Sequence, residues 1–233
     1  MAARLGVVAA LPLEARWLTN NHSTGAGQAP LLQVSGPEVE QAYRAAQALL
    51  NRGATALLSW GVAGALEDSS RAGSLVLPQA VVDFNRQEWA VDPRWHSELS
   101  DCVQGKVPCV FGKLATSDKV LTNAHEKIAF GRSFGAVAVD TESAGIARAA
   151  AQARIPYLVI RAIVDRLVWK LPICVTNAVN PHGSINPSMM LGALAKRPYD
   201  LFHVLRLVMG WRAAKQSMSR VISLAGPGFL FPR

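Results

Sequence analysis

The hydrophobic positions of this chain fall into short runs that alternate with segments rich in helix-forming residues. Short apolar runs predict strands at residues 5–10, 31–34, 56–59, 74–84, 107–115, 136–139 and from Pro156 onward. Helical segments are predicted at 13–18, 38–52, 123–130 and 143–154, and Gly53 is well placed to end the second of them. Such alternation indicates an α/β fold. Residues 85–106 show no clear pattern, so we expect a loop near the site or at an interface.

Two acidic residues stand at the ends of predicted strands. Glu142 follows the run 136–139, and Asp165 ends the run that starts at Pro156. The helix predicted between them suggests a crossover between parallel strands, and open α/β sheets bind ligands beyond the carboxyl ends of their strands. Both acids are therefore expected at one edge of the sheet. Taken singly, each has a plainer interpretation, since an acid suits a helix N-terminus and an aspartate often caps a turn.

The length and composition of the chain limit the classes of protein that it can be. Its 233 residues fit a single domain, 1–233, with a large core. Hydrophobic residues make up 50%, yet no apolar run approaches the roughly 20 residues of a membrane-spanning helix. The N-terminus leads into the first strand and lacks the features of an export signal. Three cysteines without metal-ligand spacing argue against disulfides and zinc, so we expect a cytoplasmic protein.

The positive charge is concentrated in the C-terminal segment 198–233. Residues 196–233 carry a net charge of +6 out of the +8 of the whole chain. An apolar set recurs there near helical spacing, interspersed with basic residues: Leu201, Phe202, Leu205, Val208, Met209 and Trp211, with Arg206, Arg212, Lys215 and Arg220. This basic amphipathic helix either packs on the sheet or contacts an anionic membrane surface. Nucleic acid is not an expected partner, because no binding motif accompanies the charge.

Four motifs stand in order along the chain: LGVVAALPLEA at 5–15, WGVAGAL at 60–66, DTES at 140–143 and RAIVD at 161–165. In this order they resemble the nucleoside phosphorylase and nucleosidase superfamily, which includes purine nucleoside phosphorylase, uridine phosphorylase and methylthioadenosine/S-adenosylhomocysteine nucleosidase. The resemblance spans roughly residues 5–166. It implies a three-layer αβα fold with a central mixed sheet, an enzyme that cleaves N-glycosidic bonds, and a homo-oligomer.

A narrower resemblance lies in the last third of the chain. Its residues are Leu171-Pro172, Asn177, Pro181-His182-Gly183, the segment 194–198 and Arg212-Ala213-Ala214. They resemble the tail of the hopanoid-biosynthesis-associated phosphorylase branch. This implies release of adenine from adenosylhopane, a lipid-linked nucleoside, to leave ribosylhopane. An insoluble substrate of this kind favours peripheral attachment to the inner face of the cytoplasmic membrane.

The superfamily resemblance also implies roles for particular residues. Asp165 would protonate the departing purine, Glu142 would accept hydrogen bonds from the ribose hydroxyls, and Glu14 would activate the attacking water. An acid on one side of the sugar and a base on the other have a parallel in glycosidases. Five further residues would form the walls of the substrate site: Thr141, Val62, Ala63, Val120 and Leu121.

The nucleophile is water or phosphate, and no bound cofactor is implied. Phosphorylases hold the phosphate dianion with arginines, but their paired arginine motifs are not evident here, and Glu14 would repel a dianion. Hydrolysis is therefore favoured, although Arg16, Arg71 or Lys119 could supply positive charge to a phosphate co-substrate. The alternatives are a general methylthioadenosine/S-adenosylhomocysteine nucleosidase, a purine nucleoside phosphorylase, or a non-catalytic nucleoside or lipid binding protein.

Overall fold

The computed structural model describes residues 3–19, 29–169, 200–226 and 228–231. The polar segment with Gly25 and Gly27, for which the sequence predicts a loop, lies outside these residues, as do the tail motifs from Leu171 to Pro198. The described strands are β1 Leu5–Ala9, β2 Leu31–Val34, β3 Ala56–Ala65, β4 Leu75–Val82, β5 Glu88–Ala90, β6 Cys109–Thr116, β7 Ala136–Asp140 and β8 Tyr157–Asp165. The described helices are α1 Pro12–Thr19, α2 Val39–Asn51, α3 Pro93–Val103, α4 Ala124–Phe134, α5 Ser143–Ala153 and α8 Asp200–Ala225.

The strands form one mixed sheet that partly closes on itself. β1 pairs in parallel with β2 and β3, and β3 pairs in parallel with β8. From β8 the pairing continues through β4 and β6 to β7, and β7 returns antiparallel to the end of β3. The five strands β3, β8, β4, β6 and β7 therefore make a closed ring beside the open part of the sheet. Ring closure places the ends of β3, β7 and β8 next to one another.

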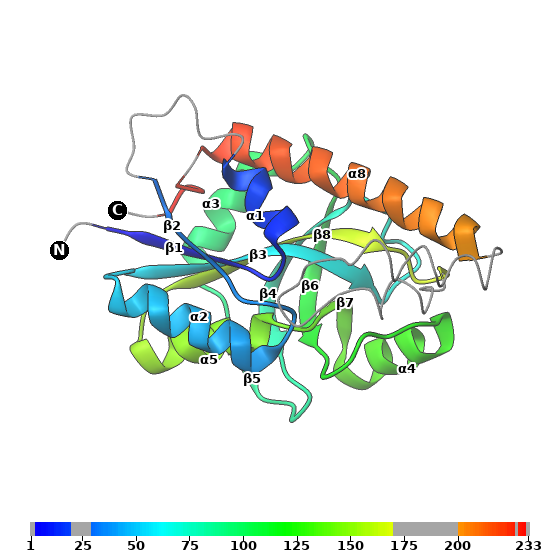
Figure 1. Cartoon of the computed structure of the whole chain (residues 1–233), viewed down its shortest axis with the longest axis horizontal. Coiled ribbons are helices and arrows are strands. Elements are labelled where there is room, and N and C mark those ends of the chain that lie inside the picture. Colours follow the sequence, from blue (N-terminus) through cyan, green and yellow to red (C-terminus); the bar gives the residue numbers. More distant parts are fainter. Residues whose placement is uncertain (1–2, 20–28, 170–199, 227, 232–233) are drawn as a thin grey trace.

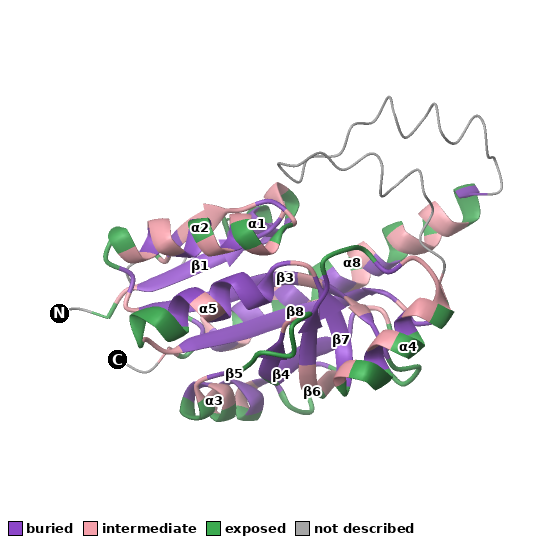
Figure 2. Ribbon diagram, turned by 90° about the horizontal axis from the view of Figure 1, so that it is seen from below, coloured by how far each residue is buried: buried purple, intermediate pink, exposed green. Residues whose placement is uncertain are grey.

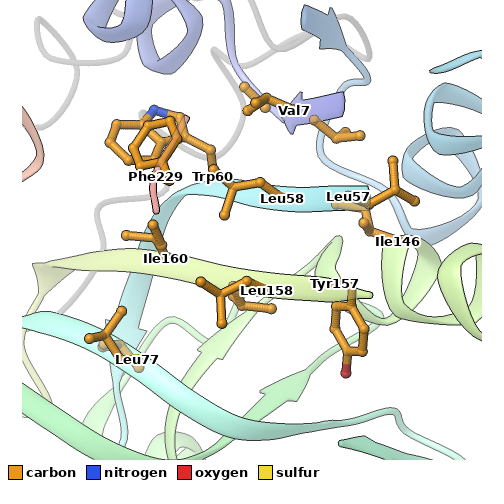
Figure 3. Close-up of a cluster of buried hydrophobic side chains, with 14 of the residues drawn as sticks. Val7, Leu57, Leu58, Trp60, Leu77, Ile146, Tyr157, Leu158, Ile160 and Phe229 are labelled. Atoms are coloured by element: carbon orange, nitrogen blue, oxygen red, sulfur yellow. The ribbon is translucent and has the colours of Figure 1, made fainter. Parts of the chain in front are cut away.

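Helices cover the sheet on both faces. Figure 1 shows α1, α3 and α8 on one side and α2 and α5 on the other. The central strands β3 and β8 are almost wholly buried, whereas the outer faces of the helices are exposed (Figure 2). Side chains from these two strands fill the core, where Trp60 packs on Phe229 with ring centroids 5.1 Å apart (Figure 3). The predicted α/β fold with a central mixed sheet is confirmed.

The expectation of a loop over residues 85–106 is wrong. The segment contains β5 and the helix α3, and the helix begins where the Asp92 carboxylate accepts a hydrogen bond from Trp95 N, with Pro93 at the first helical position. Trp95, Leu99 and Val103 are spaced by four residues and are all buried. Spacing by four puts these side chains on one helix face, so the segment contributes to the core.

The helix α8 divides into two halves with different surroundings. Its second half packs on the core through Ala214, Met218, Val221 and Ile222. The first half leaves Leu201, Phe202, Leu205, Val208 and Met209 exposed. The second half thus packs on the sheet, as one interpretation expected, whereas membrane contact of the exposed first half stays a prediction.

Trp211 does not belong to the exposed apolar set in which the sequence analysis placed it. Its ring lies edge-on to Trp17 of α1, with centroids 5.4 Å apart, and it packs against the core. Within the described residues, no helix has both the length and the hydropathy that crossing a membrane requires.

Candidate active site

A cavity of about 170 Å³ opens where the ends of β3, β7 and β8 meet. Seven of the eight residues predicted for the site line it: Val62, Ala63, Val120, Leu121, Thr141, Glu142 and Asp165. The cavity is also lined by Lys119 and Lys127, and by Leu207 from α8. The eighth predicted residue, Glu14, lies behind the wall that Val62 forms. Five elements far apart in the sequence, β3, α4, β7, β8 and α8, thus supply one site.

Glu142 and Asp165 line the same cavity, but the strands that carry them are not paired as the sequence suggested. β7 and β8 are not a parallel pair: β7 runs antiparallel to the end of β3, and β8 runs parallel to β3. Gly64 of β3 is paired with Val139 on one side and with Asp165 on the other. The acids converge because the ring of strands closes around the end of β3.

Asp165 is held by one of its two carboxylate oxygens. Lys127 Nζ donates to Oδ2 at 2.5 Å, while Oδ1 is buried and has no hydrogen-bond partner within the described part of the chain. Burial raises the pKa of Asp165 to about 6, against the opposing effect of Lys127. Asp165 lines the cavity, and a carboxyl with this pKa and one unbonded oxygen is suited to give a proton to a base bound there.

Glu142 is buried at the start of α5 and is fixed by two neighbours. The Thr141 hydroxyl donates to its Oε1 at 2.5 Å, and Arg161 Nη2 lies 3.2 Å from its Oε2. Burial raises the pKa of Glu142 to about 8, although Arg161 opposes this. The carboxyl group of Glu142 faces the cavity and can bond to a polar ligand there.

Glu14 lies behind the cavity wall and is 1% exposed. Its Oε1 accepts a hydrogen bond from Val62 N at 3.0 Å, and its Oε2 accepts one from Leu11 N at 2.8 Å. Burial raises the pKa of Glu14, against the effect of Arg161 and these backbone donors. A raised pKa makes its carboxylate a stronger base.

A glycine makes this close packing behind the wall feasible. A Cβ at position 61 would lie 2.3 Å from Arg161 Nη1 and 2.7 Å from Glu14 Oε1. Gly61 lies inside β3, which continues to Ala65 and does not end at Ser59 as the sequence predicted. The small residues after Ser59 therefore continue the strand and admit the charged groups beside it.

Arg161 belongs to this site, although its place in the motif at 161–165 predicted no role for it. It is 1% exposed on β8, and its Nη2 lies 2.8 Å from Asp140 Oδ2 and bonds to the hydroxyls of Ser59 and Ser143. Burial by itself would lower the pKa of Arg161, but the neighbouring carboxylates outweigh it and raise the pKa. The sequence did contain a signal for this role, namely a charged residue inside an otherwise apolar strand. Arginine is almost never fully buried unless it is paired, so a buried arginine implies partners of opposite charge.

Asp140 and Lys127 were also missed. Asp140 Oδ1 accepts hydrogen bonds from Thr116 Oγ1 and from the backbone N–H of Ser143, so it fixes the start of α5. Lys127 is fully buried in α4. No local signal distinguishes it from an exposed helical lysine, since its partner is 38 residues away.

The charges at the site do not favour a dianion. Arg161 faces three carboxylates, those of Asp140, Glu142 and Glu14. Lys127 is already paired with Asp165. Of the three basic residues considered for phosphate, Lys119 lines the cavity, whereas Arg16 and Arg71 are exposed and absent from its lining. In the described part of the chain, no group of three or more His, Cys, Asp and Glu side chains is arranged to hold a metal ion.

A profile of the phosphorylase superfamily matches residues 5–170. The chain belongs to the phosphorylase superfamily. The predicted superfamily, its fold and an enzymatic nature are thereby confirmed. No curated protein sequence matches the chain.

Solved structures of nucleosidases and of a hydrolase resemble the chain over most of its length. A 5′-methylthioadenosine/S-adenosylhomocysteine nucleosidase from Neisseria meningitidis, in complex with methylthio-immucillin-A, is 15% identical with a TM-score of 0.70, covering 95% of this chain and 97% of that one. Futalosine hydrolase of Helicobacter pylori is 14% identical with a TM-score of 0.68, covering 95% and 96%. The corresponding nucleosidase from Colwellia psychrerythraea, in complex with adenine, is 21% identical with a TM-score of 0.62, covering 71% and 84%. At these identities the likeness establishes the fold.

Proposed function

We propose that this chain is a purine nucleosidase that cleaves the N-glycosidic bond of adenosylhopane with water, releasing adenine and ribosylhopane. One observation carries the proposal: Glu142 and Asp165 line a single cavity, Asp165 Oδ1 has no hydrogen-bond partner among the described residues, and Glu14 lies behind the cavity wall. An acid, a base and a ribose-binding carboxylate are the groups that this reaction requires.

The leaving base needs a proton, because adenine departs poorly as an anion. Asp165 gives the proton from Oδ1 to a ring nitrogen of adenine as the bond to the sugar lengthens. The pKa of about 6 keeps part of this carboxyl protonated near neutral pH. Because the proton donor must be protonated, kcat/KM is expected to fall as the pH rises through the pKa of Asp165.

The sugar becomes cationic while the base departs. Glu142 accepts hydrogen bonds from the ribose hydroxyls, and these bonds strengthen as positive charge develops on the ring. Glu14 takes a proton from the attacking water, whose oxygen bonds to the anomeric carbon. The strand end from Val62 to Gly64 separates Glu14 from the cavity, so the proposed step requires this strand end to shift until the water reaches both Glu14 and the anomeric carbon.

Water is favoured over phosphate by the charge of the site. A phosphate dianion needs positive groups that are free to bind it. Arg161 Nη2 is already held by Asp140, by Glu142 and by the hydroxyls of Ser59 and Ser143, and Lys127 is paired with Asp165. The remaining cation of the cavity, Lys119, is exposed to solvent, which weakens its attraction for an anion.

The lipid part of the proposed substrate rests on the tail resemblance and on α8. Leu207 of α8 lines the cavity, and Leu205, Val208 and Met209 beside it in sequence are exposed. An apolar 5′ substituent that leaves the cavity past Leu207 would meet this exposed apolar surface. A substrate with a small 5′ group would not use it.

The substrate is tested by measuring adenine release from adenosylhopane in detergent beside methylthioadenosine. We expect the hopanoid to be cleaved at least tenfold faster, in kcat/KM, than methylthioadenosine, about the discrimination that a few methylenes provide. Cleavage of methylthioadenosine alone would refute the hopanoid substrate. That result would support a methylthioadenosine/S-adenosylhomocysteine nucleosidase, the alternative that the similar solved structures favour.

The exposed half of α8 is proposed to attach the protein to an anionic membrane surface. Arg206 and Arg212 adjoin the apolar residues, and basic side chains near anionic lipid add about 1 kcal/mol each. Replacing Phe202, Leu205 and Met209 by serine is expected to weaken sedimentation with phosphatidylglycerol vesicles by roughly tenfold or more. Deleting the segment 198–233 would not test this surface by itself, because the second half of α8 belongs to the core.

A matched control replaces three exposed apolar residues elsewhere: Phe84, Phe111 and Ile128. This control variant should sediment like the parent. Equal sedimentation of the parent and the α8 variant would contradict the membrane proposal. A third result is that the α8 substitutions convert a parent oligomer to monomers without any change in sedimentation. This result would assign the surface to the homo-oligomer expected from the sequence.

A further inference from the structure

The environment of Lys127 is unusual for a lysine on a helix. Its side chain is 1% exposed, and its Nζ bonds to Asp165 Oδ2 at 2.5 Å, to the carbonyl oxygen of Arg166 at 2.9 Å and to that of Trp169 at 3.2 Å. A lysine ammonium has three N–H donors, and all three are used. Lys127 Nζ is therefore fixed between α4 and the end of β8.

We propose that Lys127 is a positioning residue for Asp165: it fixes Oδ2, leaves Oδ1 facing the substrate, and stabilises the negative charge that Asp165 acquires on giving up its proton. This inference rests on the proposed function, in which Asp165 protonates the departing adenine. Lys127 itself does not touch the reacting atoms. It acts through the carboxyl group to which it is bonded.

The first part of this role follows from geometry. A carboxyl group rotates about its Cβ–Cγ bond, so a free Asp165 could turn either oxygen in either direction. The bond from Lys127 to Oδ2 fixes the rotation of the carboxyl group and with it the position of Oδ1. Oδ1 is the buried oxygen that has no hydrogen-bond partner in the described residues. A misplacement of about 1 Å at a reacting group can cost 10²-fold in rate.

The second part follows from charge. When Asp165 gives its proton to adenine, a carboxylate forms in a buried site, where an unpaired charge is costly. The Lys127 ammonium is already in contact with that carboxylate, so no reorganisation is required at the moment of transfer. The same charge lowers the pKa of Asp165 against the larger effect of burial, which makes the carboxyl a stronger acid.

Other charged groups lie near enough to be considered. Lys119, Asp140 and Glu142 line the same cavity as Asp165. Arg166, the next residue in the chain, lies 3.9 Å from Asp68 at the surface. Burial lowers the pKa of Lys127, and Asp165 opposes this. Among these groups, Lys127 is the one that directly contacts Asp165 through its side chain.

The test compares Lys127→Met with Lys127→Arg, using adenine release from adenosylhopane as a function of pH. In Lys127→Met, kcat is expected to fall about 10- to 100-fold. The alkaline limb of kcat/KM is expected to move upward by about one pH unit or more, because the group that lowers the pKa of Asp165 is gone. Lys127→Arg keeps the charge, so the alkaline limb of kcat/KM for this variant should stay at nearly the same pH as that of the parent.

A substrate-free measurement separates this inference from the proposed function. The ¹³Cγ chemical shift of Asp165, followed over pH, reports its protonation directly and should show a higher pKa in Lys127→Met. The control is Lys113→Met, which removes a partly exposed lysine whose Nζ lies 2.7 Å from Glu88 Oε2 and should change neither measurement. Thermal unfolding of each variant monitors folding.

Each outcome has a definite meaning. A lower kcat with an unmoved limb and an unmoved Asp165 titration would show that Lys127 only braces the fold, and would overturn the inference. An unchanged kcat would overturn it as well. A parent protein whose Asp165 titrates as expected but which releases no adenine would overturn the proposed function, and with it the catalytic role of Lys127, while confirming the electrostatic coupling.

Discussion

Asp165→Asn is expected to lower kcat for adenine release by about 10²- to 10⁴-fold, the range that a general acid contributes. The amide has nearly the shape of the carboxyl group but holds no acidic proton. Adenine would then have to depart as an anion or take a proton from solvent, from which the buried Oδ1 position is shielded. The measurement is the rate of adenine release at saturating substrate, followed by chromatography.

Folding of this variant requires a control, because the substitution leaves Lys127 buried without its carboxylate partner. Breaking a buried ion pair costs about 3–5 kcal/mol. The double variant Asp165→Asn/Lys127→Met removes both charges and should recover stability without recovering activity. Asp101→Asn, an exposed aspartate on α3, should behave like the parent. Activity of the double variant close to that of the parent would remove Asp165 from the mechanism.

Glu14→Gln is expected to lower kcat by a similar factor, about 10²- to 10⁴-fold, because an amide does not accept the proton of the attacking water. KM should change little, since Glu14 does not line the cavity that receives the nucleoside. The amide oxygen can also accept from only one of the two backbone N–H groups of Leu11 and Val62. The unpaired donor destabilises the protein by about 1–3 kcal/mol, so unfolding is measured alongside activity.

Glu67→Gln serves as the control for Glu14, because Glu67 is an exposed glutamate that lies two residues after the end of β3. It should retain the rate of the parent. Addition of phosphate should not restore Glu14→Gln if water is the nucleophile. Full activity of Glu14→Gln, or its rescue by phosphate, would contradict the role given to Glu14.

Local sequence signals predicted most of the elements and the position of the acids. Apolar runs marked β7 and β8, and the acid after each run marked the end of the strand, because strand ends need no long-range information. The ring closure through β4, β6 and β7 depends on pairing between distant segments, so the sequence suggested a simple parallel pair. The acids nevertheless meet, since both strand ends flank Gly64.

The residues that the sequence missed are those whose role depends on a distant partner. Lys127 has the local pattern of an exposed helical lysine and becomes buried only because the end of β8 packs on it. The helix α3 was missed for another reason. Its sequence signal is Asp92-Pro93 followed by apolar residues spaced by four, and this pattern extends over only a few turns. The division of α8 into a core-packed and an exposed half depends on what packs against each half, which a helical period alone does not contain.

Cleavage by water in this cavity is tested most directly by incubating the parent protein with adenosylhopane in phosphate-free H₂¹⁸O and analysing the ribosyl product by mass spectrometry. We predict adenine release with one ¹⁸O atom at the anomeric hydroxyl of ribosylhopane, at a rate that phosphate does not change. Release that requires phosphate and yields a ribosyl 1-phosphate would contradict hydrolysis, and the absence of any adenine release would contradict the account as a whole.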